Sequence, residues 1–398
     1  MKIKVFLVCR LLISYYSQLN RKAFSKKKCT HESIFLEDGV LIRKKILTEK
    51  AGRWYILLVF ANPNFFIMEV LMKRRIFALA LIVITCFCLT SLAEAAGFPL
   101  SVDHALGTTE IAAKPERIAA IGWGNLDVPL ALGVAPVGVS KATYGATDAN
   151  GLFSWTNEAF KKLGVETPNV FDDTDGLDFE AINNAEPDLI LAAYSGISQD
   201  EYAQLTEIAP TLAYQEAWAI TWQNLILENG RALGMENEAE ALVASTSELI
   251  AEKAASHPEI AGLTAAYCYF DTSNLGSFYV YMPKDPRAAY LIDLGLDLPQ
   301  NIRDLDDGSF FFMTVSSENI DVLKDLDLII CWGEKDILAA LQADPLIAQV
   351  PAIARGSVVF LSLDTALIAA SCTPTPLAIP ATIDEYLDLI SEASTFVK

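Results

Sequence analysis

Aromatic side chains stand at three points where the sequence predicts that a buried strand ends. Trp123, Tyr194 and Trp332 each follow or close a short apolar run, and glycine or serine flanks each of them. In open parallel sheets, ligands bind outside the carboxyl ends of the strands. Rings gathered there would line a cleft for a bulky, partly apolar ligand. For other aromatic residues, such as Tyr267 and Phe270, packing in the core is the simpler interpretation.

Further residues in these loops, or on strand and helix segments near them, are candidates for the same cleft. They combine rings for stacking with a few polar groups that could orient a ligand. The predicted ligand-binding residues are Trp123, Gly124, Asn125, Trp155, Tyr194, Ser195, Trp218, Tyr279, Tyr281, Arg287, Trp332 and Ser371.

Nothing in the sequence argues for catalysis. A hydrolytic triad needs a histidine or an equivalent base, and residues 96–398 hold only His104 and His257. His257 stands beside Pro258 at a predicted helix end, where capping is the simpler role. A histidine-based zinc site is excluded by this count, and the HExxH, phosphate-binding-loop and GxGxxG motifs do not occur. We therefore predict a protein that is not an enzyme and that holds neither a metal of its own nor a cofactor.

One stretch sets the organisation of the chain. Residues 175–196 combine a helical apolar pattern that begins at Phe179, a break at Pro187, and a short apolar run of the length that a strand buried on both faces needs. Residues 315–334 repeat this order less perfectly. The repeat predicts two similar α/β lobes.

The longest helical pattern of the chain lies between the two copies, over residues 238–255. It has an apolar face and a glutamate-rich face, and Pro258 closes it. We predict an N-terminal α/β lobe over residues 96–236, a connecting helix over residues 237–258 and a C-terminal α/β lobe over residues 259–398. Because a single long helix is stiff, we expect only small movements of one lobe relative to the other.

Irregular stretches separate several of the predicted elements. Residues 141–156 are predicted to form a long loop of the kind that is functional or mobile. The proline-rich stretch 371–380 is predicted as a second loop, and residues 218–233 as a helix.

The formal net charge of −20 is unevenly distributed along the chain. Residues 1–95 hold 16 of the 30 basic side chains but only 6 of the 50 acidic ones, which leaves residues 96–398 with a net charge of −30. Such a body does not favour nucleic acid or an anionic membrane surface. Its three cysteines, Cys268, Cys331 and Cys372, are too few for a disulfide framework.

A secretory signal is predicted over residues 72–95. Three basic residues after Met72 precede an apolar run, and an A-x-A cleavage site follows at Ala93-Glu94-Ala95. A membrane anchor is the alternative, but the apolar run is shorter than the ~20 residues that a span needs. Residues 1–71 have no continuity of composition with the acidic body, so we expect a wrongly assigned start or a disordered leader there. Attachment of a lipid at Cys86 is a further alternative, which the weak motif before it does not favour.

Several motifs resemble one protein family when they are taken in chain order. They are Pro115-Glu-Arg-Ile118, Leu126-Asp-Val-Pro-Leu-Ala-Leu-Gly133, Phe179-Glu-Ala-Ile182 with Pro187-Asp-Leu-Ile190, Ile208-Ala-Pro210, and Asp285-Pro-Arg287 with Leu294-Gly-Leu296. Together they resemble the periplasmic iron-siderophore binding proteins of ABC importers, over residues 99–398. The resemblance implies a class III periplasmic binding protein fold, the helical-backbone metal-receptor type, with two Rossmann-like lobes joined by one long helix.

The resemblance also implies a function and partners. An exported, periplasmic monomer would capture a ferric siderophore between its lobes and deliver it to a membrane permease and its ATPase. In this family one surface glutamate per lobe docks on the permease, and by motif these positions fall on Glu180 and Glu318. On the sequence alone, an acid at the start of a helix is explained as well by the helix dipole.

One departure from the family bears on the ligand. Many relatives carry an arginine before the Phe179 helix, where it suits anionic catecholate or citrate complexes. This chain has the acidic stretch Asp172-Asp-Thr-Asp-Gly-Leu177 there, with Arg287 as the remaining candidate anion contact. We therefore expect a neutral or cationic hydroxamate complex.

Two alternatives remain open on the sequence. A haem- or cobalamin-binding protein of the same fold could use Tyr194 or His104 as an axial ligand. A metal-dependent enzyme or chelatase on a similar two-lobed fold would need a cluster of histidines or carboxylates at a strand end, and none stands out.

Overall fold

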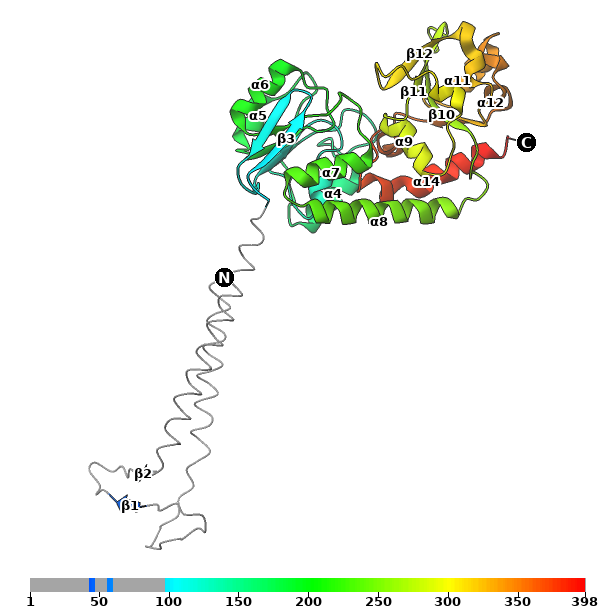
Figure 1. Ribbon diagram of the computed structural model, residues 1–398. Coiled ribbons are helices and arrows are strands. Elements are labelled where there is room, and N and C mark those ends of the chain that lie inside the picture. Colours follow the sequence, from blue (N-terminus) through cyan, green and yellow to red (C-terminus); the bar gives the residue numbers. More distant parts are fainter. Residues whose placement is uncertain (1–42, 47–55, 60–96, 398) are drawn as a thin grey trace, which may run out of the picture. The chain divides into compact units, whose positions relative to one another are not determined.

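The computed structural model describes residues 43–46, 56–59 and 97–397 (Figure 1). The chain divides into two units, Met1–Ser91 and Leu92–Lys398. In the first unit, β1 (Arg43–Ile46) pairs with β2 (Ile56–Val59) in antiparallel fashion. The rest of the predicted leader and the predicted signal peptide lie outside the described residues, and the elements below all belong to the second unit.

A five-stranded, wholly parallel sheet forms the centre of the N-terminal lobe. Its order is β7-β6-β5-β8-β9, and every residue of the three middle strands is buried, as in a sheet covered on both faces. The strands are β5 (Ile118–Ala120), β6 (Gly138–Ser140), β7 (Val170–Phe171), β8 (Leu189–Leu191) and β9 (Thr211–Leu212). The helices are α3 (Asp127–Ala131), α4 (Ser154–Lys162), α5 (Phe179–Asn184), α6 (Gln199–Ile208) and α7 (Trp222–Ala232).

A hairpin of β3 (Leu100–His104) and β4 (Gly107–Ile111) precedes this sheet. The Thr109 hydroxyl donates a hydrogen bond of 2.5 Å to the carbonyl oxygen of Thr211 in β9. The hairpin is thereby attached to the edge of the parallel sheet.

The sheet of the C-terminal lobe is mixed. Its order is β12-β11-β10-β13-β14, in which β10, β13 and β14 are parallel while β11 and β12 are antiparallel to their neighbours. The strands are β10 (Ala265–Phe270), β11 (Ser277–Tyr281), β12 (Phe312–Ser316), β13 (Leu328–Trp332) and β14 (Val358–Leu361). The helices are α9 (Pro286–Asp293), α10 (Gln300–Arg303), η1 (Ser317–Leu323), α11 (Ile337–Ala343), η2 (Ile347–Gln349), α12 (Pro351–Arg355), α13 (Ala366–Cys372) and α14 (Ala378–Ser394).

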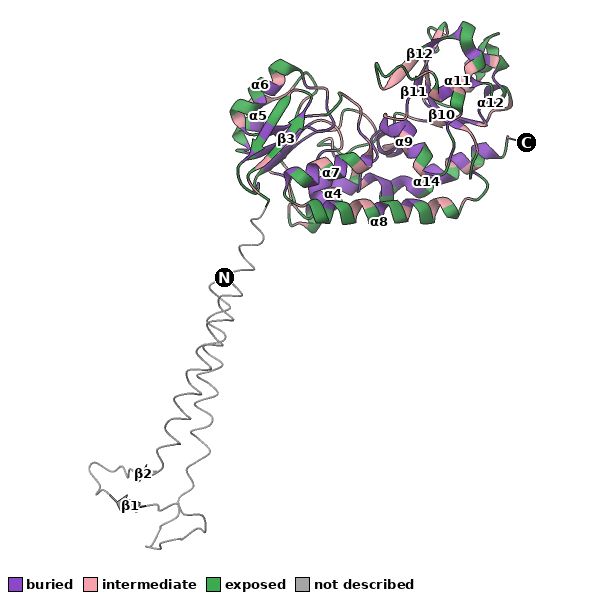
Figure 2. Cartoon of the chain, in the orientation of Figure 1, coloured by how far each residue is buried: buried purple, intermediate pink, exposed green. Residues whose placement is uncertain are grey.

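One long helix, α8 (Glu236–Ala255), connects the two sheets in the chain. It packs against α7 and α14, and it buries Ala239, Thr246 and Ile250 on that side. Most of its other positions are exposed (Figure 2). Two α/β lobes joined by a single long helix are the architecture that the sequence predicts.

The repeated stretches have the same structural function in both lobes. Asp188, just before β8, accepts hydrogen bonds of 2.9 Å from the backbone N–H groups of Glu116 and Arg117, which precede β5. Asp327, just before β13, accepts one of 2.9 Å from the N–H of Thr264, which precedes β10. Each aspartate therefore aligns the starts of two neighbouring parallel strands.

Three predicted elements differ from the structure. The helix predicted from Trp218 begins at Trp222, because Trp218 has a φ of 59°, which no right-handed helix accommodates. The loop predicted over residues 141–156 ends where α4 begins at Ser154. The predicted loop 371–380 is shortened to residues 373–377, because α13 extends to Cys372 and α14 begins at Ala378. Pro380 falls in the first turn of α14, where a missing N–H costs nothing.

Candidate ligand-binding site

A pocket opens at the carboxyl ends of β5 and β6 and extends to the segment between α13 and α14. It holds about 530 Å³ of empty space, including its open mouth, and its surface is mostly apolar. Its lining residues include Gly122, Trp123, Gly124, Asp127, Lys141, Tyr144, Phe153, Trp155, Thr373 and Thr375. Three predicted site residues, Trp123, Gly124 and Trp155, therefore lie together in one pocket.

Four rings form an aromatic cluster on the N-terminal lobe. The centre of the Trp123 ring lies 5.3 Å from Tyr144, 6.1 Å from Tyr194 and 5.0 Å from Trp218. Tyr194 is almost fully buried beneath the others, whereas Trp123, Tyr144 and Trp218 are half-buried. The rings meet edge to face or tilted, and their partly open faces offer a surface for a large ligand with apolar parts.

Two glycines allow the loop after β5 to approach its neighbours closely. Gly122 and Gly124 have φ values of 73° and 71°, a region that favours glycine. A Cβ at Gly122 would lie 2.6 Å from the carbonyl oxygen of Tyr194, and one at Gly124 would lie 2.9 Å from Thr373. A side chain at position 122 or 124 would therefore force the loop that carries Trp123 away from Tyr194 or from Thr373.

Trp218 has a strained backbone conformation and packs closely against Ser195 and Gly196. Its left-handed backbone is unusual for a bulky residue, and its N–H donates a hydrogen bond of 3.1 Å to the carbonyl oxygen of Ser195. A Cβ at Gly196 would lie 2.2 Å from the Trp218 ring, so glycine is needed there. The strained residue lies beside Trp123 in the aromatic cluster, where strain of this kind is often functional.

A second aromatic cluster belongs to the C-terminal lobe. Tyr279 stacks on Phe312 at 4.5 Å, and Tyr269 lies 4.8 Å from Trp332. Phe310, which is 40% exposed, lies 4.3 Å from Phe311. The predicted residues Tyr279, Tyr281 and Trp332 thus gather on this lobe, outside the lining of the pocket itself.

Arg287 lies against the second cluster and is paired with an acid. Its guanidinium lies 4.3 Å from the centre of the Tyr281 ring, and its Nη1 donates a bond of 2.5 Å to Oδ2 of Asp285. Burial raises the pKa of Asp285 to about 6, although Arg287 opposes the rise, so this carboxyl is ionised at neutral pH. Burial alone would lower the pKa of Arg287, but Asp285, together with nearby groups that include Tyr194, raises it well above its ordinary value. Arg287 and Asp285 are therefore both charged at neutral pH and form a buried ion pair.

An exposed ion pair joins loops of the two lobes. Nζ of Lys284 lies 2.6 Å from Oε1 of Glu216, two residues before Trp218. The same Nζ donates a hydrogen bond of 3.2 Å to the carbonyl oxygen of Gly308, two residues before Phe310. Lys284 thereby connects the loop that carries one aromatic cluster to the loop that carries the other.

Asp127 connects the N-terminal lobe to the crossover segment, Thr373–Leu377, which links α13 and α14. Its carboxylate accepts hydrogen bonds from Nε1 of Trp155 at 3.2 Å, from the Thr156 hydroxyl at 3.1 Å and from the Thr375 hydroxyl at 2.5 Å. Burial raises the pKa of Asp127 to about 6, against the opposing effect of the three donors. Tyr144 adds a second tie, 3.2 Å from the Thr373 hydroxyl.

Three predicted site residues have side chains that lie in the interior. Asn125 is wholly buried, and its side chain bonds to Ile121 and to both backbone groups of Tyr194. The hydroxyl of Ser195 donates to Ala192, and that of Ser371, inside α13, donates to Ile368. The polar atoms of all three side chains form hydrogen bonds with backbone groups of the protein, and these bonds stabilise the loops and the helix in which the residues lie.

The residues that sequence reasoning missed are Asp127, Tyr144, Phe153 and the threonines of the crossover segment. An acid inside the apolar helix pattern of residues 126–132 was the available signal for Asp127, because an unpaired buried charge is costly. The threonines gave no local signal, because 248 residues separate Thr375 from Asp127 in the chain.

His104 does not lie at the pocket. It is buried in the β3–β4 hairpin, where Nδ1 accepts a hydrogen bond of 3.2 Å from the N–H of Leu106 and Nε2 lies 2.9 Å from the Thr109 hydroxyl. Both ring nitrogens are engaged. Among residues 97–397 no group of three or more His, Cys, Asp or Glu side chains is arranged to hold a metal ion.

Residues 118–365 match the periplasmic binding protein family. The chain belongs to this family. A probable siderophore-binding lipoprotein of Bacillus subtilis, YfiY, is 30% identical over 155 residues, which are 38% of this chain and 44% of that protein, so the match spans less than half of the relative's length. The ferric enterobactin-binding periplasmic protein FepB of Escherichia coli is 26% identical over 290 residues, 68% of this chain and 86% of that one.

Solved structures of the family extend the likeness. PiaA of Streptococcus pneumoniae, in complex with ferrichrome, is 43% identical, covers 75% of this chain and 99% of its own, and has a TM-score of 0.72. Staphylococcus aureus SirA, complexed with staphyloferrin B, is 23% identical, covers 73% of this chain and 98% of its own, and has a TM-score of 0.57, so this likeness supports the fold alone. This periplasmic binding protein therefore has the class III fold that its motifs predict.

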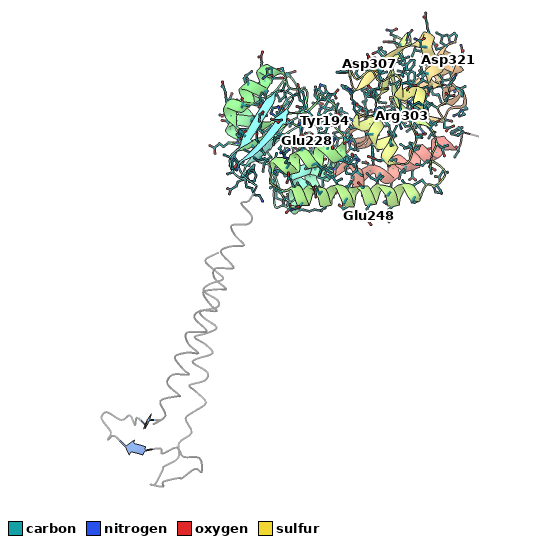
Figure 3. All side chains as sticks on the ribbon, viewed as in Figure 1. Tyr194, Glu228, Glu248, Arg303, Asp307 and Asp321 are labelled. Atoms are coloured by element: carbon teal, nitrogen blue, oxygen red, sulfur yellow. The ribbon has the colours of Figure 1, made fainter. Side chains whose placement is uncertain are left out.

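Asp127 should make stability depend on pH. A pKa raised from 3.8 to about 6 means that the folded state binds the proton more tightly, so this group's contribution is fully present below pH 3.8 and is lost as pH rises through 6. Asp285 and the half-buried Glu228 of α7 (Figure 3), whose pKa burial raises to about 7, act in the same direction. We expect D127N to reduce the gain in unfolding free energy between pH 7 and pH 5, measured by urea denaturation.

The matched control is D384N, which removes an exposed acid from the ion pair between Lys253 of α8 and Asp384 of α14. It should keep the wild-type dependence on pH. An identical pH dependence in wild type and D127N would contradict the assignment of this proton to Asp127.

Proposed function

We propose that this protein captures a ferric siderophore of the hydroxamate type in the cleft between its aromatic clusters and delivers it to the permease of an ABC importer. The observation that carries the proposal is the aromatic pocket built around Trp123 in a member of the periplasmic binding protein family. The likeness to PiaA, whose structure holds the trihydroxamate ferrichrome, supports it. In this function the protein carries its ligand without changing it.

The chemistry of the cleft suits such a ligand. A ferric hydroxamate surrounds its iron with oxygen atoms and presents carbon chains outward, so the rings of Trp123, Tyr144 and Trp155 can cover those chains while the iron needs no ligand from the protein. Lys141, at the pocket, is paired with Asp172 at 2.6 Å, and this contact lowers the pKa of Asp172 to about 2. The acidic stretch that replaces the family's arginine therefore neutralises a cation beside the ligand.

The geometry disfavours the haem alternative. An axial ligand must present a free nitrogen or oxygen to the iron, and both nitrogens of His104 are engaged. Tyr194 is only 2% exposed, and burial raises the pKa of its hydroxyl well above the ordinary value, which opposes the phenolate form that binds iron.

Replacing Trp123 should weaken binding. Full burial of a large apolar side chain is worth about 1.5–3 kcal/mol, so we expect W123A to raise the dissociation constant for a ferric trihydroxamate about 10- to 100-fold. The dissociation constants of W123A and of the wild-type protein are measured by the quenching of tryptophan fluorescence by the iron complex.

F396A is the control, because Phe396 is an exposed aromatic residue that lies outside this pocket. It should bind as wild type does. If the wild-type protein bound no ferric trihydroxamate, or if W123A bound it as tightly, the proposed function would be wrong.

The Lys284–Glu216 pair should slow release of the ligand. It connects the two aromatic loops, and exposed ion pairs are worth up to about 1 kcal/mol, so we expect K284M to release the chelate about two- to fivefold faster. Stopped-flow displacement gives the rate. K253M, which breaks a comparable exposed pair between α8 and α14, should leave the rate unchanged; equal rates for K284M and wild type would show that the pair has no such role.

Glu180 and Glu318 are the proposed contacts to the permease. Both are exposed, and each lies in the first turn of its helix, α5 or η1, at corresponding positions of the two repeated stretches. Two acids of this kind, one per lobe, could pair with basic groups on a permease while the cleft remains filled.

We expect E180A/E318A to reduce ATP-driven uptake of the iron complex at least tenfold through the reconstituted transporter, while the dissociation constant of the complex stays within twofold. E240A/E248A, which removes two exposed acids from α8 (Glu248 in Figure 3), is the charge-matched control. Equal uptake by the two double variants would argue against this docking site.

Export follows from the same proposal. A protein that passes iron complexes to an importer works on the outer side of the membrane, as the secretory signal predicted over residues 72–95 requires. In the part of the chain that the structure describes, no helix has the length and apolar character needed to cross a membrane.

A further inference from the structure

Asp285 and Arg287 form a buried ion pair at the start of α9. Asp285 is fully buried and Arg287 is 7% exposed. The carboxylate accepts from Nη1 of Arg287 at 2.5 Å and from the backbone N–H of the same residue at 2.9 Å. Nε of Arg287 is also buried, and no partner for it occurs among the described residues. The arginine thus has a free N–H donor, but its charge is already neutralised.

The other cations near the cleft are neutralised as well. Lys141, which lines the pocket, pairs with Asp172, and Lys284, between the two aromatic loops, pairs with Glu216. In the described part of the chain, each of the three basic side chains placed at the pocket or against the aromatic clusters therefore has a carboxylate within 2.6 Å. A cleft built to attract an anion would leave at least one of these charges unpaired.

We propose that Asp285 determines specificity: by holding Arg287 in a neutral pair, it makes the cleft select ferric chelates that carry no net negative charge. The inference rests on the proposed function, because it concerns the charge of the same ligand. Asp285 acts through Arg287 and is a positioning residue.

The physical reason is the low polarity of the surroundings. Arg287 lies over the Tyr281 ring and 5.9 Å from the centre of the Phe311 ring, so water screens its charge poorly. Without Asp285 it would be an uncompensated buried cation, which attracts anions strongly. With Asp285 in place, an anionic ligand gains nothing from Arg287 and is repelled by the acidic body, whose net charge over residues 96–398 is −30.

The test uses three ferric complexes with one metal-binding part. Each is a linear trihydroxamate whose pendant chain ends in an ammonium group, an acetamide or a carboxylate, so the complexes carry a net charge of about +1, 0 and −1 at pH 8. Dissociation constants come from quenching of tryptophan fluorescence for wild type, D285N, R287Q and D285N/R287Q. The quantity compared is the ratio of the constants for the carboxylate and acetamide complexes.

We expect wild type to bind the acetamide complex at least tenfold more tightly than the carboxylate complex. D285N should lower the ratio at least tenfold. R287Q should leave it within threefold of wild type, because a buried carboxyl that loses its cationic partner takes up a proton, and the double variant should do the same. A shift of the ratio in D285N that the second substitution R287Q cancels reports charge, because a purely structural loss would weaken all three complexes alike. D384N, at an exposed pair outside the pocket, should leave the ratio unchanged.

The inference is overturned if wild type prefers the carboxylate complex, if D285N changes the ratio by less than twofold, or if D285N/R287Q lowers the ratio as much as D285N does. Should D285N not fold, the ratio in wild type still decides, because a value below tenfold contradicts the inference. Failure of the proposed function gives a different result, since wild type would then bind none of the three complexes.

Discussion

The arrangement of the site depends on a carboxylate that has been removed from water. Asp127, in α3, is buried against α4 and the crossover segment. Two of its donors, Trp155 and Thr156, are neighbours in α4, and the third, Thr375, lies 248 residues away in the chain. A buried charge is costly unless it is hydrogen-bonded, so the fold gains most when all three donors are in place together. One acid therefore sets the position of the Trp155 ring and of the segment that faces it across the pocket.

In the proposed function, recognition of the ligand depends on rings more than on charge. Trp123, Tyr144, Tyr194 and Trp218 form one cluster, and the residues around Tyr279 and Phe312 form the other. The basic side chains nearby are paired with acids, which leaves stacking, apolar contact and single N–H donors as the means of binding. Such a surface fits a chelate that encloses its iron in its own oxygen atoms, because the protein has only to cover the outside of the complex.

The connecting helix explains how two lobes can hold such a surface. α8 packs along α7 and α14, so it is supported on one side for much of its length, and α14 begins directly after the crossover segment that Asp127 holds. The Lys284–Glu216 pair adds a weaker and more exposed link between the aromatic loops. The buried hydrogen bonds of Asp127 are therefore the stronger of these two links, and the exposed ion pair is the weaker.

The sequence alone determined the fold class and the long helix, because these follow from local patterns: the periodicity of residues 238–255 and the short apolar runs. Rings next to glycine at predicted strand ends also indicated the aromatic pocket that holds Trp123 and Trp155. The sequence could not decide which polar residues face the ligand. The sequence predicts Asn125, Ser195 and Ser371 as ligand contacts, but their side chains donate hydrogen bonds to backbone carbonyl groups. Nor could it reveal that Thr375 meets Asp127, or that the strained backbone of Trp218 turns its ring towards Trp123. Those are contacts between distant segments, and only the packed tertiary structure brings such segments within hydrogen-bonding distance.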